Sequence, residues 1–217
     1  MLRVSEVFRS VQAEGSHTGT PAAFIRLYGC GVQCPWCDTP YTWKHPVQSV
    51  TFAELVTAPA ESPLVAEVAE DDLAAWVAAQ GVRHVVLTGG EPLEQPLTPL
   101  LQRLPQIVQV ETSGTVLPSR ETLALIDWLT VSPKVAMPGG RRVHREMIDL
   151  AHEIKMPVGR TRDLAHLFDL LEAARPETPV WLQPLSLSPK ATELCLHVAA
   201  REGWKVSLQH HKTAGMR

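Results

Sequence analysis

The chain has 217 residues, with 20 lysines and arginines against 23 aspartates and glutamates, and a formal net charge of −3. This balance gives no basic surface for nucleic acid, and no apolar run is long enough to span a membrane. The first residues, MLRVSEVFRSVQAEG, include Glu6 and lack the apolar core of a secretory signal, so we expect a cytoplasmic protein. The length and a hydrophobic content of 45% suit a single domain over residues 1–217.

The predicted elements alternate between strands and helices along the chain. Short apolar runs predict strands at 22–28, 84–87, 107–111, 128–131, 154–158, 179–183 and 205–208. Helical patterns predict helices at about 71–80, 97–104, 119–127, 143–153, 163–174 and 189–202. The Pro- and Ala-rich segment at about 44–70 predicts an irregular insertion, with one or two helical turns near 51–56.

This alternation indicates an α/β fold built on a parallel sheet. About six strands are too few for a closed eight-stranded barrel, so we expect a partial parallel β/α barrel or an open curved sheet. The motifs TGGEP (88–92), ETSG (111–114) and SPK (132–134), and the segment after Gln183, each follow a predicted strand. Because functional loops follow the carboxyl ends of parallel strands, we expect these motifs to line one mouth of the sheet.

Three cysteines lie close together in a loop after the first predicted strand. Cys30, Cys34 and Cys37 are spaced C-x3-C-x2-C, whereas Cys195 falls within a predicted helix and is expected in the core. Clustered cysteines in a reducing compartment indicate metal or redox chemistry. Iron–sulfur clusters are usually held by four thiolates, so three ligands leave one iron open to another molecule.

A structural zinc site is the alternative reading of the cysteine loop, with His17 or His45 as the fourth ligand. Structural zinc sites are closed and four-coordinate, and they commonly combine two pairs of ligands. A single triplet fits this pattern poorly, which favours the cluster.

The segment CGVQCPWC resembles the cluster loop of radical S-adenosylmethionine (SAM) enzymes, and TGGEP resembles their GGE motif. The resemblance implies a partial barrel of the radical SAM type with a reduced helical layer. It also implies a [4Fe–4S] cluster whose open iron binds SAM, and reduction by a donor such as flavodoxin or ferredoxin. The glycines would permit close approach to SAM, and a carboxylate suits its ammonium group.

A closer resemblance is to the 7-carboxy-7-deazaguanine synthases. It is carried by QAEG (12–15), FIRL (24–27), CDT (37–39), ETSG, SPK, LQP (182–184) and QHHK (209–212). It implies conversion of 6-carboxy-5,6,7,8-tetrahydropterin to 7-carboxy-7-deazaguanine with loss of ammonia, a step in 7-deazapurine and queuosine biosynthesis. It further implies Mg²⁺ as a cofactor and a homodimer.

The same resemblance implies roles for individual residues. The cluster would be held by Cys30, Cys34 and Cys37, and Mg²⁺ by Thr39. SAM would be bound by Trp36, Cys37, Asp38, Gly90, Ser132, Pro133, Lys134 and Gln183. The pterin would be bound by Val11, Gln12, Ala13 (usually glycine in the family), Glu14, Arg26, Thr88, His211 and the main-chain carboxylate of Arg217.

Two alternatives remain open. Arg26 lies in an apolar strand and could simply pair with a buried acid such as Glu14. A radical SAM activase that abstracts hydrogen from a partner protein would also need the cysteine loop, but it would need neither Arg26 nor the terminal carboxylate.

Overall fold

The computed structural model describes residues 1–44 and 47–215. In this part of the chain, ten strands form one sheet. They are β1 (Leu2–Val11), β2 (Pro21–Leu27), β3 (Gln48–Ser49), β4 (Leu64–Val68), β5 (His84–Gly89), β6 (Ile107–Thr112), β7 (Trp128–Val131), β8 (Glu153–Val158), β9 (Val180–Pro184) and β10 (Lys205–Val206).

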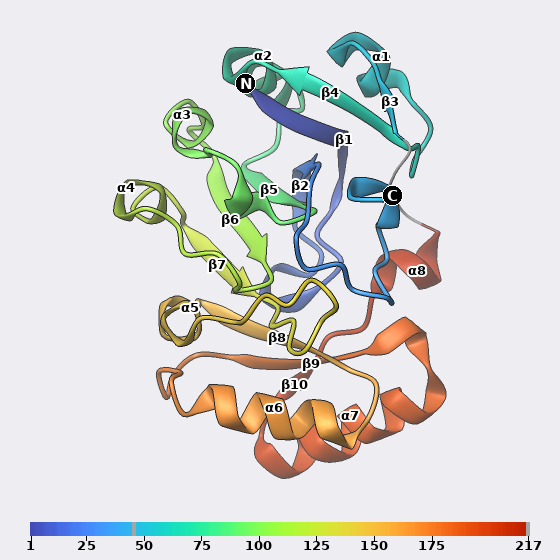
Figure 1. Cartoon of the computed structure of the whole chain (residues 1–217), viewed down its shortest axis with the longest axis vertical. Coiled ribbons are helices and arrows are strands. Elements are labelled where there is room, and N and C mark those ends of the chain that lie inside the picture. The colour runs from blue at the N-terminus through green and yellow to red at the C-terminus, as the bar shows by residue number, and fades with distance from the viewer. Residues whose placement is uncertain (45–46, 216–217) are drawn as a thin grey trace.

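The sheet is mostly parallel, which confirms the predicted α/β fold. Its order is β10-β9-β8-β7-β6-β5-β2-β1-β4-β3 (Figure 1). All neighbours from β10 to β2 are parallel, whereas β1 is antiparallel to both β2 and β4. The seven predicted ranges correspond to β2 and to β5 through β10, so the expected count of about six falls short mainly because it leaves out β1, β3 and β4 at one edge.

The helices lie between successive strands, and several are short. They are α1 (Phe52–Thr57), α2 (Glu70–Ala79), α3 (Thr98–Leu101), α4 (Arg120–Leu123), α5 (Arg145–Leu150), α6 (Thr161–Leu171), α7 (Pro189–Glu202) and α8 (His210–Ala214). Short 3-10 turns occur at η1 (Gly15–His17), η2 (Pro40–Thr42), η3 (Pro92–Glu94) and η4 (Leu185–Leu187). Among the described helices, none is both long and apolar enough to cross a membrane.

The segment predicted as an irregular insertion contains regular structure from Gln48 onward, which corrects that expectation. Strand β4 pairs with β1, and β3 pairs with β4. The predicted helical turns are present as α1, which begins with a capping box between Thr51 and Glu54. Strand β4 was missed because it is short, and because its partner β1 lies about sixty residues earlier in the sequence.

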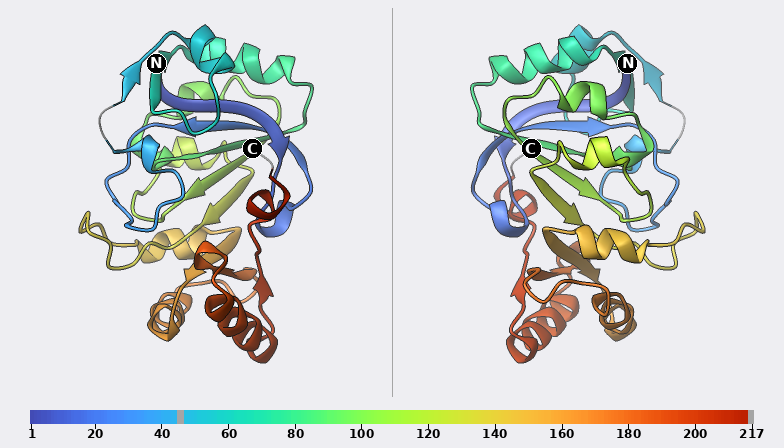
Figure 2. Two further views of the ribbon diagram at one scale, coloured as in Figure 1. Left: turned by 90° about the vertical axis from the view of Figure 1, so that its right-hand side faces the viewer. Right: turned by 90° about the vertical axis from the view of Figure 1, so that its left-hand side faces the viewer.

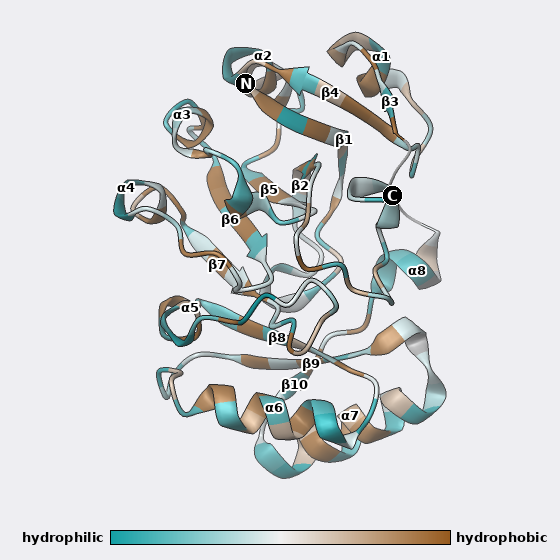
Figure 3. Ribbon diagram, viewed as in Figure 1, coloured by the Kyte–Doolittle hydropathy of each residue, from teal (hydrophilic) through white to brown (hydrophobic). Residues whose placement is uncertain are grey.

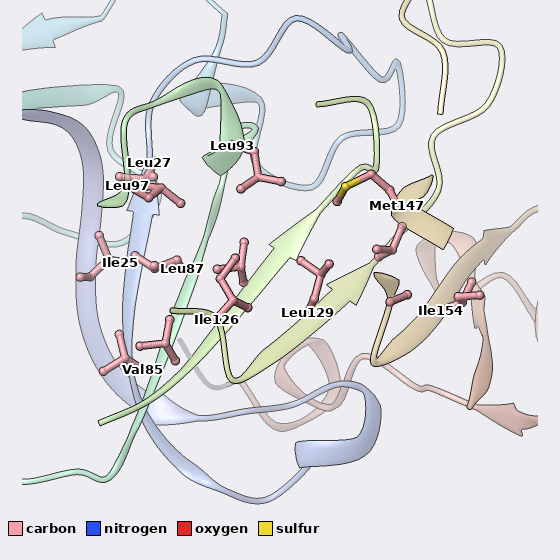
Figure 4. Close-up of a cluster of buried hydrophobic side chains, with 14 of the residues drawn as sticks. Ile25, Leu27, Val85, Leu87, Leu93, Leu97, Ile126, Leu129, Met147 and Ile154 are labelled. Atoms are coloured by element: carbon pink, nitrogen blue, oxygen red, sulfur yellow. The ribbon is translucent and has the colours of Figure 1, made fainter. Parts of the chain in front are cut away.

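Strand residues alternate between two faces of the sheet. Val85 and Leu87 of β5 belong to a large buried apolar cluster, together with Ile25 and Leu27 of β2 (Figure 4). Apolar sides of the helices complete this cluster, as the brown segments in Figure 3 show. Burial of each such side chain contributes about 1.5–3 kcal/mol. The opposite face of the sheet carries Thr88, which lines a pocket.

Candidate functional site

A pocket of about 250 Å³ opens on the face of the sheet away from the apolar cluster. It takes residues from the cysteine loop and from all the strand-end motifs, which confirms the expectation of one shared mouth. The predicted residues that line it are Val11, Gln12, Ala13, Glu14, Arg26, Cys30, Cys34, Trp36, Cys37, Asp38, Thr39, Thr88, Gly90, Ser132, Lys134, Gln183 and His211. Pro133 is not among the lining residues, and Arg217 lies outside the described residues.

The cysteine loop follows β2 directly, so it stands at the carboxyl end of the parallel strands. The Cys37 amide donates to the Cys34 carbonyl over 3.1 Å, which forms a tight turn. Burial raises the pKa of the Cys34 thiol to about 11, although Lys134 opposes this rise. Cys30 and Cys37 lie close enough to affect the same thiol. All three thiols therefore face one region of the pocket.

The alternative reading of the cysteine loop is a site for a single metal ion. Across residues 1–44 and 47–215, no three His, Cys, Asp or Glu side chains converge closely enough to hold one metal ion. A four-iron cluster needs a wider spacing of thiols, because each thiolate binds a different iron. His17 packs against His84 and Trp128 and is not a pocket residue, so its proposed role as a zinc ligand is wrong. His45 lies outside the described residues.

Glycines allow two other loops to pack against the cysteine loop. A Cβ atom on Gly90 would lie 1.9 Å from the carbonyl oxygen of Gly29. One on Gly139 would lie 1.8 Å from the carbonyl oxygen of Gly31, and the Gly139 amide donates to Val32. The TGGEP loop and the segment after β7 therefore brace the cysteine loop through backbone contacts that no other residue type fits.

Glu91 of the TGGEP motif holds two strand-end loops together. Its side chain is 1% exposed and accepts hydrogen bonds from Thr112 Oγ1 (2.7 Å) and from the amide of Ser113 (2.8 Å). Burial raises its pKa, while these bonds oppose the rise. The carboxylate is thus directed into the protein, which overturns its interpretation as a partner for an ammonium group.

The loop between β1 and β2 forms the floor of the pocket. Val11 pairs with Pro21 at the start of β2, so this loop enters from the amino-terminal edge of the parallel strands. Gln12 Nε2 donates to Glu111 Oε1 over 3.1 Å. The floor and the end of β6 are thereby joined inside the pocket.

Glu14, also in the floor, forms an ion pair with Lys155 of β8. Burial alone would raise the pKa of Glu14, but the Lys155 ammonium and hydrogen bonds from Lys155 and Gln209 lower it to about 2. Burial also opposes the charge of Lys155, yet Glu111 and Glu14 raise its pKa. Both members of this pair are therefore charged at neutral pH.

Arg26 pairs with a buried acid, as the alternative in the sequence analysis supposed, although the acid is Glu6 of β1 and not Glu14. Its Nε donates to Glu6 Oε2 over 3.0 Å, and the Tyr41 hydroxyl donates to the same oxygen over 3.1 Å. The Arg26 side chain is 18% exposed and lies over the ring of Phe8, which stacks on Phe24 at 4.8 Å. The guanidinium is therefore held in place while it still lines the pocket.

The end of the described chain closes one side of the pocket. Gln209 Nε2 donates to Glu14 Oε1 (3.0 Å) and to Asp38 Oδ2 (2.9 Å). Lys212 Nζ lies 2.8 Å from Asp38 Oδ1. Burial lowers the pKa of His211, which lines the pocket beside Glu14. Both views in Figure 2 show α8 beside the β1–β2 loop, and the His210 amide donates to the Ala13 carbonyl.

The remaining wall is formed by the ends of β7 and β9. Lys134 Nζ donates to the hydroxyl of Ser132 over 2.5 Å and lies 5.5 Å from the ring centre of Trp36. Gln183 Oε1 is buried and has no hydrogen-bond partner among the residues that the structure describes, so this wall offers an unused acceptor. Thr39 Oγ1 lies 3.8 Å from Cys37 Sγ at the edge of the cysteine loop.

Sequence reasoning missed several side chains of the pocket. Lys155 was not singled out, and Glu111 and Gln209 were noted only as parts of motifs. The aromatic pair Phe8 and Phe24 was also missed. A lysine inside a strand whose other side chains are mostly apolar was the signal available for Lys155, because a buried charge requires a partner.

Comparison with known proteins agrees with this geometry. No protein-family model matches the chain. The 7-carboxy-7-deazaguanine synthase of Escherichia coli K12 is 42% identical over 217 residues, covering 96% of each chain. Those of Buchnera aphidicola subsp. Schizaphis graminum and of Synechocystis sp. are each 33% identical, covering 96% and 99% of this chain and 96% and 93% of their own.

The crystal structure of QueE from Escherichia coli matches with a TM-score of 0.86 and 39% identity, covering 96% of this chain and 93% of that chain. The mostly parallel sheet and the three-cysteine loop at its mouth, together with these relatives, define a radical SAM enzyme. Within that class, the chain belongs to the 7-carboxy-7-deazaguanine synthase family.

Proposed function

We propose that the pocket converts 6-carboxy-5,6,7,8-tetrahydropterin to 7-carboxy-7-deazaguanine with loss of ammonia, as a carbon–nitrogen lyase of queuosine biosynthesis. The supporting observation is a single pocket with three cysteines at its mouth and paired carboxylates at its floor. Relatives that carry the name of this activity span nearly the whole chain. Residues 1–217 would act as one radical SAM domain, with the curved sheet as a partial barrel.

Cys30, Cys34 and Cys37 would hold a [4Fe–4S] cluster with one iron left for SAM. When bound and reduced by flavodoxin or ferredoxin, the cluster and SAM supply a 5′-deoxyadenosyl radical that abstracts hydrogen from the substrate. The residues present fit this group, because the thiols share one region and the buried Gln183 Oε1 offers an acceptor without a partner. The full set proposed for SAM is Trp36, Cys37, Asp38, Gly90, Ser132, Pro133, Lys134 and Gln183.

The floor of the pocket would bind the pterin. Gln12 and Glu14 would meet the donor-rich edge of the aminopyrimidinone ring, since a carboxylate accepts hydrogen bonds from N–H groups. Arg26 is fixed through Nε by Glu6, and a guanidinium has five N–H donors, so it can also bind the substrate carboxylate. Further contacts are proposed for Val11, Ala13, Thr88, His211 and the main-chain carboxylate of Arg217.

Thr39 would bind Mg²⁺ together with the substrate carboxylate and water. Mg²⁺ prefers octahedral oxygen coordination and commonly borrows ligands from substrate and solvent. A hydroxyl at the edge of the cysteine loop is placed to hold such an ion between the cofactor and the pterin side of the pocket. Removal of Mg²⁺ with a chelator is expected to raise the KM for the pterin.

An anaerobic assay of reconstituted protein with SAM, Mg²⁺, a reductant and 6-carboxytetrahydropterin tests the proposed function. We expect 7-carboxy-7-deazaguanine and ammonia, with SAM regenerated after each turnover. Stoichiometric consumption of SAM without a pterin-dependent product would contradict the proposal. Deletion of the last two residues separates it from the activase alternative, because only the synthase should then lose most of its activity.

We also propose a homodimer in the cytoplasm, on the strength of the family resemblance. Sedimentation equilibrium of the reconstituted protein measures the oligomeric state, and cell fractionation measures the location in the cell.

A further inference from the structure

Lys155 is a charged side chain deep in the pocket, outside the set of residues proposed to bind SAM or the pterin. Its side chain is 5% exposed and comes from the middle of β8. Its Nζ forms an ion pair with Glu14 Oε2 and lies 3.5 Å from Glu111 Oε1. One ammonium group therefore faces two carboxylates that come from distant parts of the chain.

Other donors fix the orientation of both carboxylates. Glu14 Oε1 accepts from Gln209 Nε2 over 3.0 Å. Glu111 accepts from Gln12 Nε2 at Oε1 (3.1 Å) and from Thr88 Oγ1 at Oε2 (2.8 Å). A carboxylate has about four acceptor positions, so each group retains capacity to accept from a ligand in the pocket.

Two carboxylates in one buried pocket are not both ionised without a nearby cation. Repulsion and burial would drive one of them to take up a proton, which converts an acceptor into a donor. Lys155 supplies the positive charge that prevents this, and the low pKa of Glu14 reflects the effect. The lysine thus determines the hydrogen-bonding character of the floor.

We infer that Lys155 is a positioning residue for substrate recognition, holding Glu14 and Glu111 as paired acceptors for the N–H donor edge of a 2-amino-4-oxo pteridine. The inference rests on the proposed function, because it takes a pterin as the substrate. A ring with a carbonyl in place of the 2-amino group would present an acceptor to these carboxylates. Such a ligand is rejected, since buried polar groups are then left unpaired.

The charges around the two carboxylates come from several elements. Glu14 is faced by Lys155 of β8 and by His211 of α8, with Lys134 further away. Glu111 is faced by Lys155. His211 in turn is influenced by Lys212, Asp38 and Arg26. Lys155 is the cation in contact with both carboxylates, so its removal is expected to change the protonation of Glu14 most.

Equilibrium titration of the reconstituted, SAM-bound protein with fluorescent 6-carboxypterin tests the inference. For Lys155→Met, we expect the Kd at pH 5.5 to rise about tenfold or more, because one lost acceptor leaves a buried donor unpaired. Affinity should recover as the pH is raised to about 7.5, since deprotonation restores the acceptor. The wild type should show no such dependence over this range. Lys155→Arg keeps the charge and should bind within about threefold of wild type.

Lys190→Met is the matched control, because Lys190 is an exposed lysine at the start of α7. Its affinity should equal that of the wild type at every pH. A Lys155→Met protein that binds 6-carboxypterin like the wild type at pH 5.5 would overturn the inference. A second measurement needs no variant: the wild type should prefer 6-carboxypterin over 6-carboxylumazine about tenfold or more, and equal binding would also overturn it. Failure of the wild type to convert the tetrahydropterin is a different outcome, which counts against the proposed function.

Discussion

Cys195 and Cys34 are both buried, but they lie in different surroundings. Cys195 of α7 packs in the apolar cluster on the helical face, whereas Cys34 lines the pocket. Burial raises the pKa of Cys195 to about 12, so it remains a neutral thiol. Because the pKa of Cys34 is also raised, the surroundings and not the protonation state separate the two residues. A thiol among apolar side chains behaves as a small core residue, whereas Cys34 lies near Cys30 and Cys37 in the pocket.

We therefore expect Cys195→Ala to keep the iron and sulfide content of the wild type and to lose about 1 kcal/mol of unfolding free energy. Cys34→Ala should lose the cluster, because two thiolates do not hold it. Analysis of iron and acid-labile sulfide after anaerobic reconstitution measures the cluster content of both variants. Full iron in Cys34→Ala would contradict the assignment, and a colourless wild type with equimolar zinc would favour the zinc alternative.

Gly90 is a position where the addition of one Cβ atom should destabilise the fold. Its added Cβ would meet the backbone of Gly29, which cannot move aside as a side chain can. We expect Gly90→Ala to lower the free energy of unfolding by about 1–3 kcal/mol and to reduce iron retention. Gly159→Ala is the control, because its Cβ would meet the end of the Leu185 side chain at 3.0 Å. Equal stability of the two variants in urea unfolding would contradict this prediction.

At the scale of elements, β4 extends the sheet past β1, on the edge away from the run of parallel strands from β2 to β10. Its register with β1 pairs Ala66 with Val4 and Val68 with Leu2. The adjoining segment also supports the site, since the Glu61 amide donates to the same Glu6 carboxylate that holds Arg26. The 48–68 region is thus connected to the pocket through β1.

Hydrogen exchange distinguishes a paired strand from an irregular insertion. We expect the hydrogen-bonded amides at 65–68 to exchange as slowly as those of β1, and at least about 100-fold more slowly than the amide of Ala60. Site-resolved exchange by NMR or mass spectrometry provides the measurement. Uniformly fast exchange over 48–68 would show that β4 does not form.

The parallel strands were predictable because each is a short apolar run between turn signals, as at 84–87 and 128–131. Strand β1 was not predictable from the sequence, because polar residues such as Glu6 and Arg9 interrupt its apolar pattern. Only its pairing with β2 and β4 defines it. The strand-end loops of the site were predictable from topology. Lys155 was not, because its role depends on which face of β8 turns toward the pocket.

For the whole molecule, the Glu14–Lys155 pair links stability to acid pH. The folded pKa of Glu14 is about 2 against an ordinary value of 4.5. The pair therefore stabilises the fold above pH 4.5, and this contribution is lost as the pH falls from about 4.5 to about 2. A depression of this size corresponds to about 3 kcal/mol.

We expect the unfolding free energy of the wild-type apoprotein to decline more steeply over this range than that of Glu14→Gln. Urea unfolding at successive pH values between about 2 and 5 measures the difference. Parallel pH profiles for the two proteins would show that the pair does not contribute in this way.

Gln209 bonds to Glu14 and Asp38 across 195 and 171 positions of sequence. Contacts of such wide separation form late in folding, because a long loop must close before they are made. The ribosome delivers the floor and the cysteine loop long before it delivers Gln209. The contacts that close this side of the pocket over Glu14 and Asp38 therefore become available only when synthesis of the chain is nearly finished.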